Sequence, residues 1–434
     1  MRYSVDVFRY VKLLLINSVC EALCDNAPSK YRSLCQFISR IRYQRSGMKA
    51  AGQRHREDVT LTLGKGLISG YVSAILGILS LCGVLCFRYP ELLTSEQFRA
   101  AYTQDFVRTL LFWALVVAYF AGIISYVLNC SKRLAWIGIG TALCSSILGG
   151  SRIKIQPFDS TPYSFGLDWF AIGFLFSMLI FIPIEKAFAL RKDQKILRVG
   201  WRLDLLYFVV SHLLIQFVFL WTNAFANIGF GWASTEGLQS TVRSMPIWLQ
   251  FLLAVLLADL FQYGSHRLHH KFGFLWRFHS IHHSSESMDW LAGSRTHLGE
   301  VFITRACVML PLYVCGFSEP ALNAYVILVG IQAVAIHANL GINFGPLRYV
   351  IATPQFHHWH HAKDPAYCDA NYAVHLPVID MLFGTYRCPR GEWPQEYGVV
   401  SGEPPPSFIG QLVHPFSPPV KNEGDAPDSD LEES

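Results

Sequence analysis

Histidine is the residue whose type and spacing in this chain best fit chemistry, and most of its 16 copies fall between residues 201 and 390. The stretches "FHSIHH" and "FHHWHH" each hold three histidines at positions i, i+3 and i+4, a spacing that places them on one face of a helix. These six residues are His279, His282, His283, His357, His360 and His361. Because neutral imidazole is the commonest metal ligand, the pattern predicts a metal site.

The stretch "LADLFQYGSHRLHH" adds another pair, since His266 and His270 are four residues apart and share one helical face. Asp259 and Tyr263 lie on the same stripe. A ligating histidine usually donates its other N–H to an oxygen acceptor, so both residues are predicted to support the ligands by hydrogen bonding. His269 points to a different face, and we expect it to be solvated or at a membrane interface.

His337 in "IHANLG" completes the set, His297 in "GSRTHLGE" is a further candidate outside it, and His358 lies off the face of its neighbours. Nine histidines then have ligand spacing, about twice the three to five protein ligands that one zinc or iron ion uses. Two ions are therefore predicted. The 11 cysteines are scattered and form no CxxC, which argues against a structural zinc site and a disulfide framework.

Long apolar runs must position these histidines. The chain is 52% hydrophobic and only 15% charged, against about 25% charged in soluble proteins. Runs of roughly 20 apolar residues are long enough to cross a bilayer as helices. The sequence predicts an all-α fold, a polytopic membrane helical bundle. The predicted spans are 66–87, 107–128, 134–150, 168–184, 203–225 and 246–263, with a hairpin of two more at 301–316 and 321–337.

Basic residues predict the orientation of these spans, because Lys and Arg collect in cytoplasmic loops. The first 65 residues, the pair Lys132 and Arg133, and the stretch 185–202 are basic. All three lie on the cytoplasmic side if the N-terminus is inside and the spans alternate. The sixth span then ends on that side and the hairpin returns to it, so a di-metal site is expected at the cytoplasmic face. Topology explains the basic runs, and no nucleic-acid partner is expected.

Composition divides the chain into four predicted parts. Residues 1–65 are a basic cytoplasmic N-terminal arm, and 66–200 are a four-span membrane region without histidine. Residues 201–390 carry the histidine clusters and form the predicted catalytic domain. Residues 391–434 are Pro-rich and then acidic, and a tail with so few apolar residues is predicted to be disordered.

From about "LRVGWRLDLLYF" at 197 to "DMLFGTYRCP" at 389, the sequence resembles the fatty acid hydroxylase/sterol desaturase superfamily of integral-membrane di-iron oxygenases. The blocks "ADLFQYGSHRLHH", "LWRFHSIHHSSESMDWLAGSRTHLGE", "HANLGINFGPLRYVIATPQFHHWHH" and "NYAVHLPVIDMLFGTY" carry the resemblance in order. It implies that the iron ligands are His266, His270, His279, His282, His283, His337, His357, His360 and His361. His297 stands where the family often has an R-x-H-P-x-E block, with Leu298 replacing the proline, and is a candidate ligand or supporting group.

The resemblance implies a membrane-bound oxidoreductase that uses two iron ions, O₂ and two external electrons to hydroxylate an unactivated C–H bond of a lipid, such as a sterol or fatty acyl chain. No catalytic residue beyond the metal ligands is predicted. The sequence holds no haem-attachment motif, so a separate cytochrome b5-type or ferredoxin-type donor with its reductase is expected. The membrane is a bacterial inner membrane or the endoplasmic reticulum. Two alternatives stay open: desaturation at the same site, and a metal-binding membrane transporter.

Overall fold

The computed structural model describes residues 61–94, 103–129, 132–154, 164–400 and 402–417. The chain divides into two units, Met1–Val59 and Thr60–Ser434, and every described residue belongs to the second unit. The predicted basic arm at 1–65 therefore lies almost entirely outside the described residues.

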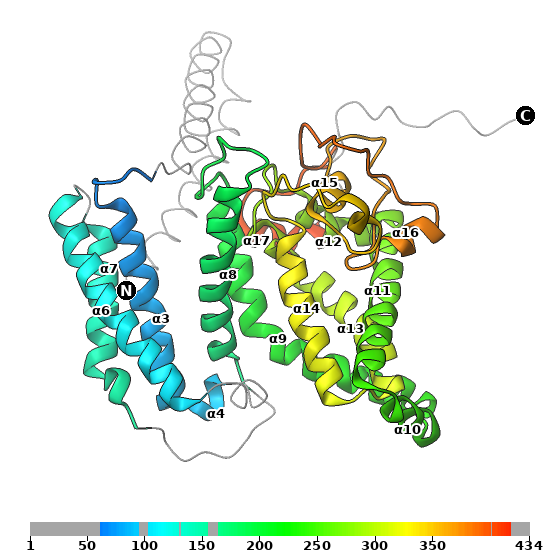
Figure 1. Cartoon of the computed structure of the whole chain (residues 1–434), viewed down its shortest axis with the longest axis horizontal. Coiled ribbons are helices and arrows are strands. Elements are labelled where there is room, and N and C mark those ends of the chain that lie inside the picture. Colours follow the sequence, from blue (N-terminus) through cyan, green and yellow to red (C-terminus); the bar gives the residue numbers. More distant parts are fainter. Residues whose placement is uncertain (1–60, 95–102, 130–131, 155–163, 401, 418–434) are drawn as a thin grey trace, which may run out of the picture. The chain divides into compact units, whose positions relative to one another are not determined.

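Long apolar helices dominate the described part of the chain, and every regular element there is helical, which confirms the predicted all-α fold (Figure 1). Helix α9 (Trp201–Phe230) covers the predicted span 203–225, and the shorter apolar helix α14 (Glu319–Ala335) is the second limb of the predicted hairpin. Six other helices among the described residues are long and apolar enough to cross a membrane. They are α3 (Leu67–Arg88), α6 (Gln104–Leu128), α7 (Arg133–Ile147) with its continuation to Arg152, α8 (Leu167–Ala187), α11 (Ile247–Lys271) and α13 (Leu298–Cys315).

Short helices and single turns fill the connections between the long helices. The short α-helices are α4 (Pro90–Leu93), α10 (Glu236–Ser244), α12 (Gly273–His283), α15 (Pro354–His360), α16 (Val378–Leu382) and α17 (Phe408–Val413). The 3-10 turns are η2 (Gly150–Arg152), η3 (Gly231–Ala233), η4 (Ala292–Ser294), η5 (Gly345–Tyr349) and η6 (His414–Phe416). Most of these short elements follow α11, in the part of the chain that carries the histidines.

Helices α3, α6 and α7 pack closely through small residues. The Ser73 hydroxyl of α3 donates to the carbonyl of Ala118 in α6 at 2.7 Å. A Cβ atom added to Gly138 of α7 would lie 2.0 Å from the Ser73 Oγ, so only glycine fits there. Small residues that allow backbones to approach, with hydroxyls bonded across helices, are typical of helix packing in membranes.

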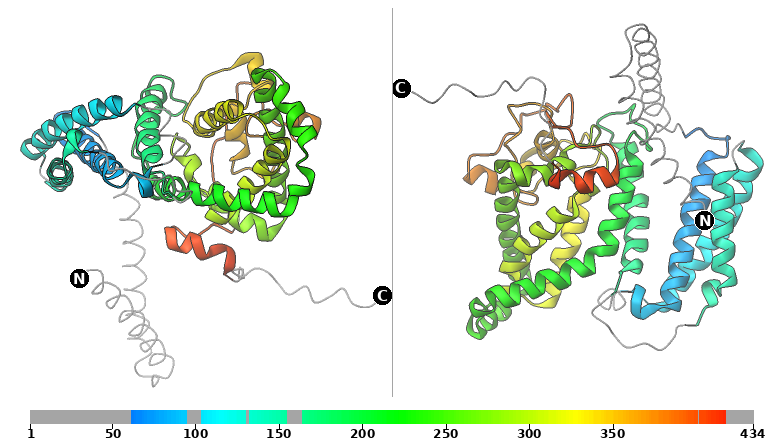
Figure 2. Two further views of the ribbon diagram at one scale, coloured as in Figure 1. Left: turned by 90° about the horizontal axis from the view of Figure 1, so that it is seen from below. Right: turned by 180° about the vertical axis from the view of Figure 1, so that it is seen from behind.

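The second half of the chain packs around α11 and α13. Helix α13 contacts α9, α10 and α11, and α11 also contacts α12 and α14. Both views in Figure 2 and the view in Figure 1 place α12, α15 and α17 together at one end of these long helices. Helices α8, α11 and α14 end there, and α9 and α13 begin there, so one end of the helices collects the connections that carry the histidines.

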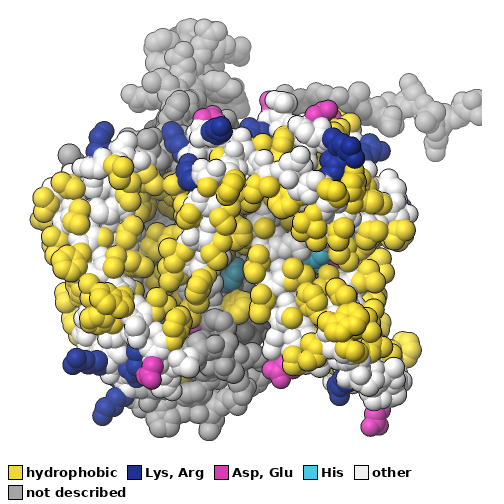
Figure 3. Space-filling model, in the orientation of Figure 1, with side chains coloured by type: hydrophobic (Ala, Val, Ile, Leu, Met, Phe, Trp, Pro, Cys, Tyr) yellow, Lys and Arg dark blue, Asp and Glu magenta, His cyan; other side chains and the backbone are white. Residues whose placement is uncertain are grey.

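The surface agrees with a membrane location. Figure 3 shows hydrophobic side chains over the middle of the long helices, while Lys and Arg gather near their two ends. Large apolar side chains that point outward include Trp113, Phe120, Leu179 and Ile327, each more than half exposed. Outward-facing apolar side chains along a helix are stable in hydrocarbon and costly in water.

The C-terminal segment corrects a prediction. Residues 391–417 were expected to belong to a disordered tail, but α17 forms there and Phe408 packs edge-on against Tyr207 with ring centroids 4.9 Å apart. The backbone N–H of Gly398 donates to the carbonyl of His361 at 3.4 Å. The prediction rested on the proline content of this segment and gave too little weight to its aromatic residues, which anchor it on the helices. Residues 418–434 lie outside the described residues.

Candidate metal centre

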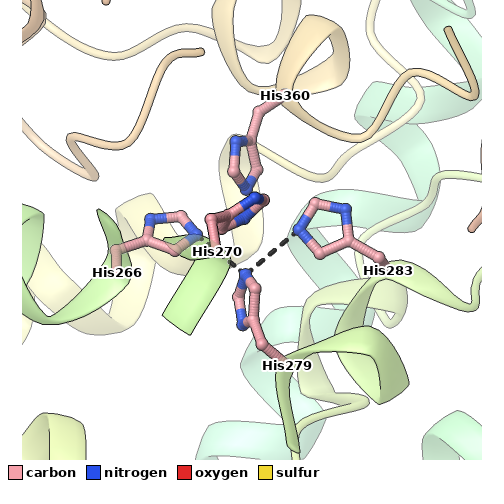
Figure 4. A group of neighbouring side chains, drawn as sticks. All are labelled: His266, His270, His279, His283 and His360. Atoms are coloured by element: carbon pink, nitrogen blue, oxygen red, sulfur yellow. Dashed lines mark hydrogen bonds between the residues drawn. The ribbon is translucent and has the colours of Figure 1, made fainter. Parts of the chain in front are cut away.

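Nine buried or nearly buried histidines form two neighbouring groups, and they are the nine residues predicted as ligands. In each group the candidate ligand atoms lie within 4.8 Å of one another. The first group, labelled in Figure 4, is His266, His270, His279, His283 and His360. The second group is His282, His337, His357 and His361. We call them the five-histidine group and the four-histidine group.

Both histidine triplets are divided between the groups. On α12, His279 and His283 belong to the five-histidine group, whereas His282 belongs to the four-histidine group. At α15 the division is reversed, because His357 and His361 join the four-histidine group and His360 joins the other. Each of these two elements therefore ties the groups together. The sequence spacing alone had suggested that each triplet serves one face.

Local capping fixes where α15 starts and so where its histidines point. The Thr353 hydroxyl accepts the N–H of Phe356 at 3.3 Å, and Pro354 occupies the first helical position. A threonine cap followed by proline is a favourable helix start, since proline lacks an N–H that would be unbonded there anyway. The two groups thus depend on a helix of only 7 residues whose start is firmly set.

Five of the rings direct Nδ1 to an oxygen atom. His266 Nδ1 donates to the carbonyl of Tyr372 at 2.7 Å, and His360 Nδ1 to that of Ala370 at 2.8 Å. The other three pairs are His279 with Glu300 Oε1 at 2.6 Å, His282 with the Arg295 carbonyl at 3.1 Å, and His337 with the Ala333 carbonyl at 2.8 Å. These acceptors place the ring proton on Nδ1 and leave Nε2 with its lone pair.

The Nε2 atoms then face one another inside each group. His266 Nε2 lies 2.9 Å from His279 Nε2, and His282 Nε2 lies 3.3 Å from His337 Nε2. In both pairs each ring already uses Nδ1 as the donor, so two lone pairs point at each other. Such an approach is repulsive unless a positive charge lies between the rings. Both groups therefore fit a bound cation.

The rings are also held in the neutral form that metals require. Burial, with a smaller effect of His337, lowers the pKa of His282 to about 3. Burial and neighbouring histidines lower the pKa values of His357 and His361 well below the ordinary value. A protonated imidazole has no lone pair to give, so neutral rings at ordinary pH keep their Nε2 atoms available as ligands.

A buried charge network supports the four-histidine group. Arg198 donates to both carboxylate oxygens of Asp289, at 2.9 and 2.7 Å, and to Asp204 at 2.7 Å. Arg295 Nε donates to the other oxygen of Asp204 at 2.5 Å. None of these four side chains is more than 7% exposed. The carbonyl of Arg295 accepts from His282, so the network fixes the orientation of that ring.

Glu300 and Arg295 are supporting residues that the sequence reasoning missed. Glu300 is 7% exposed and its Oε1 accepts the Nδ1 proton of His279. Both residues lie in the block "RTHLGE", where attention had gone to His297. The available signal in the sequence was a carboxylate three residues after a histidine, at the start of an apolar helix. Burying such a group is costly unless it has a partner, so its position indicated a bonded role.

His297 itself belongs to neither group. It caps α13, where its Nδ1 accepts the N–H of Gly299 at 2.9 Å. Its Nε2 lies 3.1 Å from the carbonyl of Leu412, in the C-terminal segment. Its ring also contacts that of Phe278. Together with the two backbone bonds, this contact indicates that His297 has a structural role and joins α13 to α17.

Asp259 and Tyr263 support the loop behind the ligands rather than the ligands themselves. The fully buried carboxylate of Asp259 accepts three backbone N–H groups, those of Val374, His375 and Leu376, at 2.6 to 3.1 Å. The Tyr263 hydroxyl lies 3.0 Å from Thr385 Oγ1. These bonds hold the 372–385 region against α11, and the carbonyl of Tyr372 in that region orients His266.

His269 and His358, which lie outside the two groups, are also buried. His269 was predicted to be solvated or at an interface, which is wrong, since it is 1% exposed. His358 is fully buried, with Nδ1 2.9 Å from the Tyr397 hydroxyl. Packing of α12 and α13 over α11 covers His269, and the C-terminal segment covers His358. Helical spacing along the sequence could not predict that these elements would cover the two histidines.

Comparisons with known proteins relate the histidine-bearing part of the chain to lipid hydroxylases. Residues 251–385 match the family model described as "Fatty acid hydroxylase". An ornithine lipid hydroxylase from Rhizobium tropici is 32% identical over 175 residues, which are 40% of this chain and 52% of that protein. An alkylglycerol monooxygenase from Caenorhabditis elegans is 31% identical over 157 residues, 35% of this chain and 30% of that protein. The chain thus spans about half or less of these relatives, and no solved structure is significantly similar to it.

Proposed function

We propose that this protein, whose residues 251–385 match the fatty acid hydroxylase family model, is a membrane-bound lipid hydroxylase with two iron ions. The observation that carries the proposal is the convergence of lone-pair-bearing Nε2 atoms in two separate groups. Each group offers four or five imidazoles, which suits one iron ion. Bound there, two ferrous ions would supply the reduction of O₂ and an oxidant able to take hydrogen from an unactivated C–H bond.

The chain's own residues hold the rings and exclude water. Glu300 and four backbone carbonyls keep five Nδ1 protons in place, so these rings cannot turn away from the centre. Such supporting bonds raise the basicity of a ligand as well as orienting it. Eight of the nine histidines are 8% exposed or less, so little water reaches their inner nitrogens. Dryness protects a reactive centre from side reactions.

Two features support a lipid as the substrate. The relatives above are named for ornithine lipid and alkylglycerol, both lipids. The helices that carry the histidines present apolar side chains outward, so a substrate dissolved in the bilayer reaches them without entering water. We infer that the oxidised carbon belongs to an apolar chain of a lipid.

The basic loops support a cytoplasmic position for the metal centre, because Lys and Arg prefer that side. The connection after α8 holds Arg191, Lys192 and Lys195 next to the histidine-bearing end. An acidic electron donor of the cytochrome b5 or ferredoxin type would be attracted there. We assign residues 66–200 as a four-span membrane region and 201–390 as the catalytic domain, against which the segment 391–417 packs.

Two alternatives remain. Desaturation at the same site differs from hydroxylation only in how the substrate carbons lie relative to the oxidant. A metal transporter would place its ligands near the middle of the membrane on broken helices. Here both groups lie where α11 and α14 end. Product analysis separates the first alternative, and O₂ consumption separates the second.

The test compares lipid profiles of cells that express the wild type or the double variant His282→Ala with His360→Ala, which removes one ligand from each group. We expect hydroxylated lipids with the wild type and none with the variant, at equal protein level. His414→Ala, outside both groups, is the matched control and should keep the product. A wild type that binds iron but leaves every lipid unchanged contradicts the proposal, and a product with one more double bond indicates desaturation.

A further inference from the structure

A groove on the outer side of the catalytic domain lies directly behind the five-histidine group. It has a volume of about 360 Å³, which exceeds the roughly 150 Å³ of an apolar cavity able to hold benzene. We call it the α11–α13 groove. Its walls are almost entirely apolar and include Leu260, Gly264, Leu268, Leu275, Ile303 and Cys307.

The groove is placed to receive a molecule from the bilayer. Its rim residues Leu260, Phe261 and Leu268 are 37%, 39% and 46% exposed, on α11, a helix long and apolar enough to span the membrane. A Cβ atom built on Gly264 has no other atom within 4 Å, so the space beside this glycine is open. An apolar chain is the occupant that such walls favour.

Two polar side chains, those of Ser265 and His269, line this otherwise apolar groove. His269 is 1% exposed, and its Nδ1 donates to the carbonyl of Ser265 at 2.8 Å. That bond leaves Nε2 as a hydrogen-bond acceptor, and Nε2 is buried without a partner. An unmade bond of this kind is costly in a nonpolar environment. A ligand with an O–H or N–H donor would satisfy it.

The groove is also close to the chemistry. The His269 ring lies 5.8 Å, centroid to centroid, from that of His279 in the five-histidine group. His269 and the ligands His266 and His270 sit on the same turn of α11. A molecule in the groove is therefore separated from the candidate metal centre by little more than one ring.

We propose that the α11–α13 groove is a lipid-binding subsite, whose occupant is a bilayer lipid with an apolar chain and a hydroxyl or amide N–H that donates to His269 Nε2. The inference rests on the proposed function and deepens it, because His269 then selects among substrates by their donor group. Apolar walls supply affinity and a small number of placed polar groups supply specificity, as in most small-molecule sites.

Binding can be measured directly with two probes that share one chain. The probes are 1-O-hexadecylglycerol, which has free hydroxyls, and its 2,3-di-O-methyl derivative, which has none. Native mass spectrometry of the purified full-length protein, loaded with iron in detergent, gives the Kd of each. We expect the wild type to bind the hydroxyl probe about tenfold more tightly. Equal binding of the two probes overturns the role of His269.

Variants separate the groove from its polar group. Gly264→Leu fills the groove and should raise the Kd of both probes tenfold or more. Gly330→Leu, on α14 and also without a neighbouring atom within 4 Å, should leave both Kd values unchanged. His269→Phe should remove the preference for the hydroxyl probe, and His269→Gln, which keeps an acceptor, should restore part of it. If Gly264→Leu does not fold, Ile303→Trp fills the same groove from α13. Unchanged binding by the filled variant overturns the subsite.

Iron content and product formation keep this test distinct from that of the proposed function. Groove variants that lose probe binding but keep iron support the subsite even if no hydroxylated lipid is ever found. Variants that bind both probes normally overturn the subsite even if the wild type is an active hydroxylase. With a lipid that is turned over, we expect Gly264→Leu to raise KM more than it lowers kcat.

Discussion

The bundle of α3, α6 and α7 and the histidine-bearing half are both helical and apolar, yet they are held together differently. In the bundle, buried polar contacts are single hydroxyls on backbone oxygens, such as Ser73 on Ala118 and Ser125 on Gly66, each at 2.7 Å. In the histidine-bearing half, buried carboxylates and guanidinium groups bond to one another and to loops. This difference indicates that buried charged groups are concentrated where loops and short helices must hold the histidine rings in place.

The largest effect is expected from breaking the buried network. Asp204 accepts from two arginines, and removing one partner of a buried ion pair leaves uncompensated charge. Asp204→Ala should therefore lower the free energy of unfolding by about 3–5 kcal/mol, whereas Ser125→Ala in the bundle should cost only about 1 kcal/mol. Unfolding in detergent measures both. Equal losses for the two variants would remove the contrast between the regions.

Within the histidine-bearing half, substitution of Glu300 is expected to lower the affinity for metal. Glu300→Ala removes the acceptor of the His279 Nδ1 proton, and loss of such a supporting group typically lowers metal affinity about 10- to 100-fold. Competition with a chelator measures the affinity for ferrous iron. Glu300→Gln retains an acceptor oxygen and should recover most of the affinity. A Gln variant as weak as the Ala variant would mean that Glu300 acts through its charge rather than by positioning.

In the N-terminal bundle the expected defect is steric. Gly138→Ala places a methyl group against Ser73 and should cost about 1–3 kcal/mol, with iron content unchanged. Gly140→Ala, two residues along the same helix where no atom lies within 4 Å, is the matched control and should cost nothing measurable. Loss of iron in Gly138→Ala would show that the bundle contributes to the metal centre.

The smallest effect is expected from removing a single hydroxyl group in the C-terminal segment. Tyr397→Phe removes the hydroxyl that lies 2.9 Å from His358 Nδ1 and should cost about 1 kcal/mol. Removal of residues 391–417 together with the tail should cost far more, because Phe408, Gly398 and the bond to His297 are lost at once. Equal stability of the chain ending at 390 and the chain ending at 417 would contradict this role.

Much of this architecture was readable from the sequence, because hydropathy locates long helices and i, i+3, i+4 spacing indicates candidate ligands. The division of each triplet between two groups was not readable, since it depends on how α12 and α15 face each other. The acceptors of four Nδ1 atoms were also hidden, because they are backbone carbonyls, which any residue type provides. His297 lies outside both groups, and its ring caps a helix, a role that a metal-like motif does not reveal.

The most direct test of the two-group centre is the number of ferrous ions that the purified protein binds without oxygen. We predict two ions per chain for the wild type. One ion should remain when the four-histidine group loses His337 and His361 to alanine. A wild type that binds a single ion, or none, contradicts the account.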